Sequence, residues 1–290
     1  MKIIFENFSK LVLKYLLFPL VIMYLPFLHS KDIEIGTNHK TYTFFQKWTK
    51  NQSCSDISIS GKKGVNRNTV ELILLCKALK IGGLNERIKV VETPNYTRSL
   101  FLAKAGSITM PSETVWITDI DKSSFYVSDP VVRKGEYEVG VYTRKDRLDM
   151  HKIRSLDELK KFSAVSSILW IHDWAALTKI GVEKHSVYNL LSMYKMVDKG
   201  RADFTLQDFQ LNNIITLDGV SLFQISNIKF VFAESRHFVV SKAQPHSKIV
   251  FLALQQGLKK LRKQGSITKA YVESGFFNVK RDTWKNLNVN

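Results

Sequence analysis

The sequence lacks the motifs by which common enzyme classes are recognised. It holds no G-x-S-x-G nucleophile elbow, no Walker phosphate loop and no H-E-x-x-H zinc motif. Its seven histidines show no metal-ligand spacing, since even His172 and His185 have no cysteine companions. We therefore expect no enzyme, no metal site and no cofactor. A hydrolase built on a carboxylate pair such as Asp119 and Asp121 is the remaining catalytic alternative.

Repeats, low-complexity segments and coiled-coil heptads are also missing. The 290 residues, 44% of them hydrophobic, suffice for one large domain or two lobes. Acidic residues are scarce, because 26 of them face 43 basic residues and leave a formal net charge of +17. Such an excess indicates an anionic partner or surroundings. No zinc finger, basic zipper or RNA-binding signature accompanies it, so we expect no nucleic-acid partner.

The amino-terminal residues predict export. Lys2, Lys10 and Lys14 are followed by an uncharged run over residues 15–28, which is short and interrupted by proline. That pattern is typical of a signal-peptide core rather than of a membrane-spanning helix. We expect residues 1–30 to form the signal peptide and the mature protein to be periplasmic. Leu28 fits a cleavage site poorly, so an uncleaved anchor stays open as the alternative.

Cysteine is nearly absent as well. In the expected mature chain only Cys54, in a polar loop, and Cys76, on an apolar helix, remain. In an oxidising compartment the two thiols could pair. Two free thiols, with Cys76 simply buried, are the alternative, and the sequence leaves both open.

Strand and helix patterns alternate along the chain. Residues 32–37, 88–91 and 115–118 have the pattern of strands, and residues 66–81 and 96–104 that of helices between them. This alternation predicts an α/β fold with a mostly parallel sheet and crossover helices. The intervening residues with Phe44, Phe45 and Trp48 are interpreted as a polar loop. Later segments are expected as strands at 137–142, 164–170 and 236–241, and as helices from 155 and at 174–180, 183–199, 248–263 and 266–274.

Residues 200–208, GRADFTLQD, give the clearest candidate for a functional position. Gly200 is a natural stop for the preceding helix, and the following apolar and polar residues alternate as in a half-buried strand. Asp208 stands at the end of that strand. Because open α/β sheets bind ligands outside the carboxyl ends of their strands, we expect Asp208 to face a cleft between two lobes. A loop-capping or solvated aspartate is the alternative.

Five stretches in a fixed order carry a resemblance to a known family. The chain resembles the periplasmic solute-binding proteins that serve polar amino-acid transporters, over about residues 31–280. Each stretch is degenerate alone, and the order and spacing of all five make the signal. They are YVSDPVV at 126–132, YEVGVYTRKDR at 137–147, SLDELKKFSAV at 155–165, GRADFTLQD at 200–208, and residues 236–276.

This resemblance implies a type II periplasmic-binding fold with two lobes that close on a solute. Lobe one would comprise residues 31–141 and 238–290, and lobe two residues 142–237. Two antiparallel strands, 137–142 and 236–241, would form the hinge. The implied protein is a monomer that captures a small polar solute for an inner-membrane ABC-type transporter or a sensor. A periplasmic interaction or sensory module with the same fold and no transport role is the alternative.

The family's binding residues transfer in part. Asp208 occupies the position of the acidic residue that often holds a ligand's amino group. Asp121 stands where the family has a carboxylate-clamping arginine, with Lys122 beside it. Aspartate cannot supply the bidentate guanidinium fork, so an ordinary α-amino acid is not the expected ligand. Lys122 would replace the arginine as a point charge, or would be a solvated turn lysine.

Three tryptophans are further candidates for the ligand site. Trp116 is near the end of a predicted lobe-one strand, and Trp170 and Trp174 belong to lobe two. Such rings can sandwich an apolar or planar part of a ligand. Ordinary core packing is the alternative for each.

Overall fold

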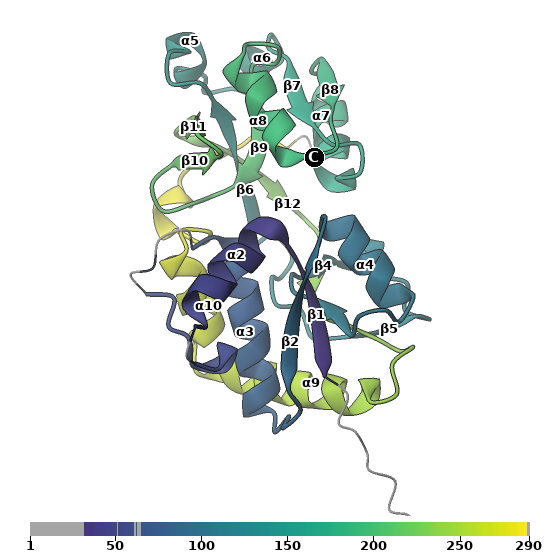
Figure 1. The fold of residues 1–290 in the computed structure, drawn as a ribbon. Coiled ribbons are helices and arrows are strands. Elements are labelled where there is room, and N and C mark those ends of the chain that lie inside the picture. Colours follow the sequence, from purple (N-terminus) through teal and green to yellow (C-terminus); the bar gives the residue numbers. More distant parts are fainter. Residues whose placement is uncertain (1–31, 51, 61, 63–64, 289–290) are drawn as a thin grey trace, which may run out of the picture. The chain divides into compact units, whose positions relative to one another are not determined.

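A computed structural model describes residues 32–50, 52–60, 62 and 65–288 (Figure 1). The expected signal peptide, residues 1–30, lies outside the described residues. Asp32–Asn290 forms a compact unit. Its mixture of several sheets with flanking helices confirms the predicted α/β class. Within the described ranges we find no helix with the length and hydrophobicity needed to span a bilayer.

The first sheet is parallel, as the alternation of strands and helices predicted. Its strands lie in the order β2-β1-β3. Asparagines start the neighbouring helices, because the side chains of Asn38, Asn66 and Asn95 each accept a backbone N–H from the first turn. The elements are β1 (Ile33–Asn38), α2 (His39–Trp48), α3 (Arg67–Ile81), β2 (Ile88–Thr93), α4 (Tyr96–Lys104) and β3 (Met110–Pro111).

A second sheet has six strands in the order β10-β11-β6-β12-β15, with β9 also paired to β6. Its internal pairs are antiparallel except for β12 with β15. Leu206 and Phe230 are both fully buried in it. The strands are β6 (Tyr137–Thr143), β9 (Thr205–Asp208), β10 (Ile214–Leu217), β11 (Val220–Gln224), β12 (Ile228–Phe232) and β15 (Lys285–Asn286).

Three smaller sheets have two strands each. The pairs β4–β13 and β5–β14 are antiparallel, and β7–β8 is parallel. The strands are β4 (Val115–Trp116), β5 (Phe125–Val127), β7 (Ala164–Ser166), β8 (Lys184–Ser186), β13 (Arg236–His237) and β14 (Val239–Ser241). The remaining helices are α5 (Leu148–His151), α6 (Leu156–Leu159), α7 (Ile171–Ile180), α8 (Leu190–Asp198), α9 (Ser247–Lys263) and α10 (Ser266–Glu273), with 3-10 turns η1 (Cys54–Asp56), η2 (Ile117–Asp119) and η3 (Val279–Arg281).

The two expected hinge strands do not pair with each other among the described residues. The partners of β6 are β9, β11 and β12, whereas β13 and β14 pair with β4 and β5. Each strand is therefore tied into a different set of neighbours, and the hinge assignment stays a prediction.

Two segments differ from their predicted structure. The expected polar loop contains α2, in which Thr41 and Trp48 are buried. Its aromatic and β-branched residues have modest helix propensity, which tertiary packing overrides. The single helix expected at 183–199 is instead β8 followed by α8, because Asn189 caps a new helix start by accepting the backbone N–H of Ser192.

Helices α3 and α9 pack side by side at a point where both backbones come close (Figure 1). Gly257 of α9 makes this possible, since a Cβ there would lie 1.8 Å from the carbonyl oxygen of Ala78. Gly82, after α3, meets the carbonyl oxygen of Ala253 in the same way. Most of α3 is buried, and Leu75 and Leu79 are fully buried.

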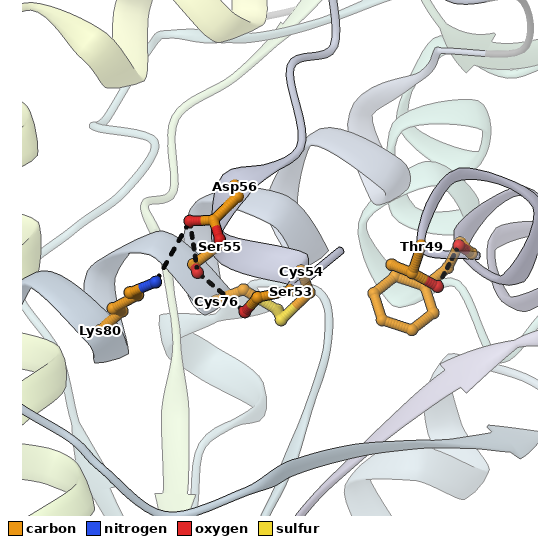
Figure 2. The surroundings of a disulfide bond; sticks show 8 residues. Thr49, Ser53, Cys54, Ser55, Asp56, Cys76 and Lys80 are labelled. Carbon is orange, nitrogen blue, oxygen red and sulfur yellow. Dashed lines mark hydrogen bonds and ion pairs between the residues drawn. A yellow bond between two sulfur atoms is a disulfide. The ribbon is translucent and has the colours of Figure 1, made fainter. Parts of the chain in front are cut away.

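A disulfide joins Cys54 of η1 to Cys76 of α3, with 5.8 Å between their Cα atoms (Figure 2). The pairing that the sequence left open is thus confirmed. Figure 2 also shows the ion pair between Lys80 and Asp56, whose atoms lie 3.2 Å apart on the same two elements. The bond ties the segment before α3 to the helix itself.

Candidate functional site

Asp208 is the last residue of β9, as predicted, and lies opposite Val139 of β6. Its side chain is 26% exposed. One carboxylate oxygen accepts a hydrogen bond from Nε of Arg67 at 2.8 Å, and the other accepts from the Tyr137 hydroxyl at 2.5 Å. Burial raises the pKa of Tyr137 well above its usual value, so this hydroxyl stays a donor. Both oxygens of Asp208 therefore already have partners within the protein.

Arg67 is the first residue of α3, and its side chain is 7% exposed. Besides Asp208, its guanidinium contacts Glu71 at 2.8 Å and Glu113 at 3.4 Å. Burial alone would lower the pKa of Arg67, but attraction by Asp208 and Glu71 raises it well above the usual value. One permanently charged fork thus holds three carboxylates together. We call Arg67, Glu71, Glu113, Tyr137 and Asp208 the polar cluster.

Glu71 is completely buried and fully hydrogen-bonded. In addition to Arg67 it accepts from the backbone N–H of Thr114 at 2.8 Å, the Thr114 hydroxyl at 2.9 Å and the Tyr271 hydroxyl at 3.0 Å. A buried carboxylate with this many donors is held in place rather than free to bind a solute. Glu71 therefore anchors the polar cluster to α10 and to the segment before β4.

The cost of burying a negative charge is less well offset by partners at Glu113 than at Glu71. Burial raises the pKa of Glu113, and the positive charges of Arg67 and Arg236 only oppose that effect. Arg236 itself is 3% exposed, and its Nε donates to the Thr114 hydroxyl at 2.9 Å. Together these residues add a partly uncompensated acid and a second guanidinium to the surroundings of the polar cluster.

Trp116 lies beside the polar cluster. Its ring centroid is 4.6 Å from that of Tyr137 and 4.5 Å from the guanidinium carbon of Arg236. The His172 ring is 4.2 Å away and its Nε2 is 3.1 Å from the Thr118 hydroxyl. Burial lowers the pKa of His172, which keeps this imidazole neutral at neutral pH. The structure thus brings Trp116 and Asp208 into one neighbourhood through Tyr137.

Asp173 is a further acid in this neighbourhood. It lies in the first turn of α7, next to His172, and is half-buried. Burial, and then the negative charge of Asp208, raise the pKa of Asp173 to about 7. No ion pair of Asp173 is recorded in the described part of the chain. The positive charges of Arg236 and Arg67 act on its carboxyl group from a distance and only partly oppose the rise of its pKa.

Trp170 and Trp174 lie at the start of α7, on either side of His172. The backbone N–H of Trp174 donates to the carbonyl of Trp170 at 2.8 Å. Trp170 packs partly buried against the cluster that contains Met193, and Lys184 lies over the Trp174 ring at 5.0 Å. Their role in binding a ligand stays a prediction.

Asp121 and Lys122 lie in a separate hydrogen-bonded turn. Asp121 accepts from Ser123 and Ser124 and pairs with Lys104 at 2.9 Å. These hydrogen bonds, led by that of the Ser123 hydroxyl, lower the pKa of Asp121 well below its usual value. Lys122 is exposed, and its carbonyl accepts from Lys242. The contacts of Asp121 thus hold the turn together and tie it to the end of α4.

Sequence reasoning missed most of the polar cluster. Arg67 and Glu71 stand four positions apart at the start of an apolar helix, a spacing that places them on one face and could have marked them. No local signal marks Glu113 or Arg236, whose partners are distant in the chain. Among the described residues, no group of histidine, cysteine or acidic side chains could hold a metal ion.

No protein-family model matches the chain, and no curated protein sequence matches it. Solved structures do resemble it. A probable amino-acid ABC transporter extracellular-binding protein from Bacillus subtilis matches with a TM-score of 0.55 at 12% identity, over 85% of this chain and 99% of its own. A substrate-binding protein of an amino acid ABC transporter from Streptococcus pneumoniae, bound to L-arginine, gives 0.53 at 12%, over 75% and 84%. An ancestral amino acid-binding protein, a precursor of cyclohexadienyl dehydratase, gives 0.51 at 17%, over 84% and 95%.

The chain has the type II periplasmic-binding fold. This agrees with the fold that the five stretches of sequence predicted. At such identities the likeness concerns the fold, and the ligands and transporters of these proteins are properties of those proteins. Two of the three are transporter binding proteins, while the third preceded an enzyme, so the type II fold is compatible with both binding and catalysis.

Proposed function

We propose that this protein is an exported, non-catalytic solute-binding protein. It captures a small polar solute between two lobes, residues 31–141 with 238–290 and residues 142–237, and delivers it to an inner-membrane ABC-type transporter or a sensor. It works as a monomer and without a cofactor. The type II fold and the polar cluster support this reading, because binding proteins of this fold grip a ligand between two lobes without changing it.

Export to the periplasm is supported by two independent features. The basic residues followed by an uncharged run at 15–28 are typical of a signal peptide. The Cys54–Cys76 disulfide fits an oxidising compartment.

The observation that carries the proposal is the set of polar contacts between residues assigned to different lobes. Arg67 belongs to proposed lobe one and Asp208 to lobe two, and they lie 2.8 Å apart. Thr118 of lobe one and His172 of lobe two form a second such contact at 3.1 Å. These contacts are a hydrogen bond and an ion pair rather than apolar packing. The polar groups of a solute can therefore replace one partner in each contact.

The charges around the polar cluster favour a solute that carries a positive group. Four carboxyl groups, those of Glu71, Glu113, Asp173 and Asp208, face two guanidinium groups in this neighbourhood. Negative groups are therefore in formal excess there, although burial is the main cause of the raised pKa values of Glu113 and Asp173. An amine or guanidinium of a solute would relieve that excess, and Trp116 offers it a neighbouring aromatic face.

Thermal unfolding with a panel of amino acids, amines, organic acids and sugars tests the proposal. A ligand that binds only the folded state must raise the melting temperature, and we expect cationic members to do so. The solute that gives the largest shift is then incubated with the protein and followed by NMR. Recovery of the unchanged solute supports binding without catalysis. Silence across the whole panel, or conversion of the solute, would overturn the proposal.

An interaction or sensory module with the same fold is the second candidate. It is favoured by one observation, namely that both oxygens of Asp208 are already bound by Arg67 and Tyr137. A chain that fills its own ligand position needs no solute. In that case the panel stays silent, and the partner is a macromolecule whose binding depends on salt, since the chain carries +17.

A further inference from the structure

A cavity of about 230 Å³ lies between the segment 129–133 and α9, and none of its residues belongs to the polar cluster. Arg133, Lys259, Arg262 and Asp129 line it with charge, and Val131 and Leu258 give it an apolar floor. The volume is below the range of about 300–1,000 Å³ that drug-sized ligands occupy. The space suits a small group rather than a whole metabolite.

Positive charge dominates the lining. Three cationic side chains face the single carboxylate of Asp129, which leaves a formal excess of two positive charges. No ion pair of Arg133, Lys259 or Arg262 is recorded within the described residues. Arg133 and Lys259 are exposed at the rim, whereas Arg262 is half-buried. Asp129 and Glu136 attract Arg262 from a distance, but the cavity presents these three cations without a direct ion pair.

Arg262 is fixed in orientation. Its Nη2 donates to the carbonyl oxygens of Pro130 and Val131 at 2.5 and 3.1 Å. Its Nε and Nη1 have no recorded acceptor in the part of the chain that the structure describes. Burial, and then the like charge of Arg133, lower the pKa of Arg262. A bound anion would offset the repulsion between these two positive charges. A guanidinium held in this way offers its remaining donors without a loss of rotamer freedom.

We propose that this cavity binds a phosphate-type oxyanion. A phosphate monoester or inorganic phosphate carries about −1.5 to −2 charges at pH 7, which matches the excess of two positive charges. Its tetrahedral oxygens can accept from Arg133, Lys259 and the free donors of Arg262 together, with charge-assisted hydrogen bonds. The anion is either free phosphate or the phosphate of a lipid headgroup. The proposal is independent of the solute that the polar cluster binds.

Two titrations separate these sources. The full-length protein in chloride buffer is titrated with inorganic phosphate by calorimetry, and is sedimented with phosphatidylcholine vesicles with and without phosphatidic acid. We expect a binding stoichiometry of one phosphate-type group for each protein chain. R133Q and K259Q should each weaken binding by about threefold to tenfold, because each removes one partly exposed charge contact. D129N should tighten binding by about twofold to fivefold, because it removes the opposing carboxylate.

Lys248 provides the matched control. It is exposed at the other end of α9 and does not line the cavity, so K248Q removes the same charge from the same helix. The expected pattern is weaker binding by R133Q and K259Q, tighter binding by D129N and unchanged binding by K248Q. If inorganic phosphate binds with this pattern, the ligand is a free anion. If only vesicles with phosphatidic acid bind with this pattern, the ligand is a lipid headgroup. The proposal is overturned if neither binds, or if K248Q weakens binding as much as K259Q does. The second result would indicate attraction by the basic surface as a whole.

Discussion

Arg67 and Asp208, 141 positions apart in the sequence, form an ion pair of 2.8 Å that joins the start of α3 to the end of β9. The arginine occupies the place beside Asp208 where the family resemblance puts a ligand's positive group. Glu71 and Glu113 hold the same guanidinium from its other donors. The protein thus carries an internal cation at the position where we propose that a solute binds.

Replacing Arg67 by glutamine should strongly destabilise the protein. R67Q leaves Glu71, Glu113 and Asp208 close together with no central positive charge. Removing one partner of a buried ion pair typically costs about 3–5 kcal/mol. Urea unfolding of wild type and variant, followed by circular dichroism, measures this loss.

The double variant R67Q/D208N serves as the control, because it removes one of the stranded carboxylates. We expect it to be more stable than R67Q alone, by roughly 1–2 kcal/mol, so the two substitutions are not additive. Additive losses, or an R67Q protein as stable as the wild type, would show that the ion pair does not hold the polar cluster together.

The sequence predicted the fold better than the site. The resemblance of five stretches to a known family implied the type II fold. The alternation of strands and helices predicted the α/β class, because each element carries its own local pattern. Asp208 was placed at a strand end for the same reason. The sequence does not reveal the role of Arg67, because its three carboxylate partners come from three places: α3, the segment before β4, and the strand β9. A local sequence pattern contains no information on contacts between distant segments.

Segments whose fold depends on neighbours were also mispredicted. The helix α2 reads as a loop because its stability comes from burying Thr41 and Trp48 rather than from its own propensity. The residues of β8 have the local pattern of a helix, although the strand pairs in parallel with β7. In both cases tertiary contacts decide a structure that the local residues leave undecided.

Asp173 should make the stability of the protein fall as pH rises. Its pKa is about 7 in the folded protein and about 3.9 when unfolded, so the folded state holds the extra proton between these values. Its contribution is therefore present below about pH 4 and is lost as pH rises through 7. We expect D173N to be more stable than wild type by roughly 2–4 kcal/mol at pH 8, with the difference shrinking towards pH 4.

Urea unfolding at several pH values measures this difference. D282N is the matched control, since Asp282 is an exposed carboxylate outside the polar cluster, and it should follow the wild type at every pH. A stability difference between D173N and wild type that does not change with pH would exclude a raised pKa at Asp173.

The Cys54–Cys76 disulfide should contribute about 2–4 kcal/mol to stability. It closes a segment with a sequence separation of 22, and loops of this size lose about 3 kcal/mol of unfolded-state entropy when cross-linked. We expect the C54S/C76S variant to unfold at lower urea concentration and to be insensitive to reductant, while the wild type loses stability on reduction. Equal midpoints for the wild type with and without reductant would contradict the role of this bond.

Gly257 should not tolerate a side chain. Alanine normally favours a helix over glycine by about 1 kcal/mol, but here its Cβ would overlap the Ala78 carbonyl across the α3–α9 contact. We expect G257A to lose about 1–3 kcal/mol in thermal unfolding. Q256A, at the exposed neighbouring position, should be neutral or slightly stabilising. A G257A protein more stable than the wild type would show that the two helices can move apart freely.

Calorimetry with the solute found in the thermal panel tests whether Asp208 binds that solute. We expect D208N to weaken solute binding at least about tenfold, because it removes the charge that faces the solute's positive group, while D282N should bind as the wild type does. Equal affinity of D208N and wild type would contradict this role of Asp208.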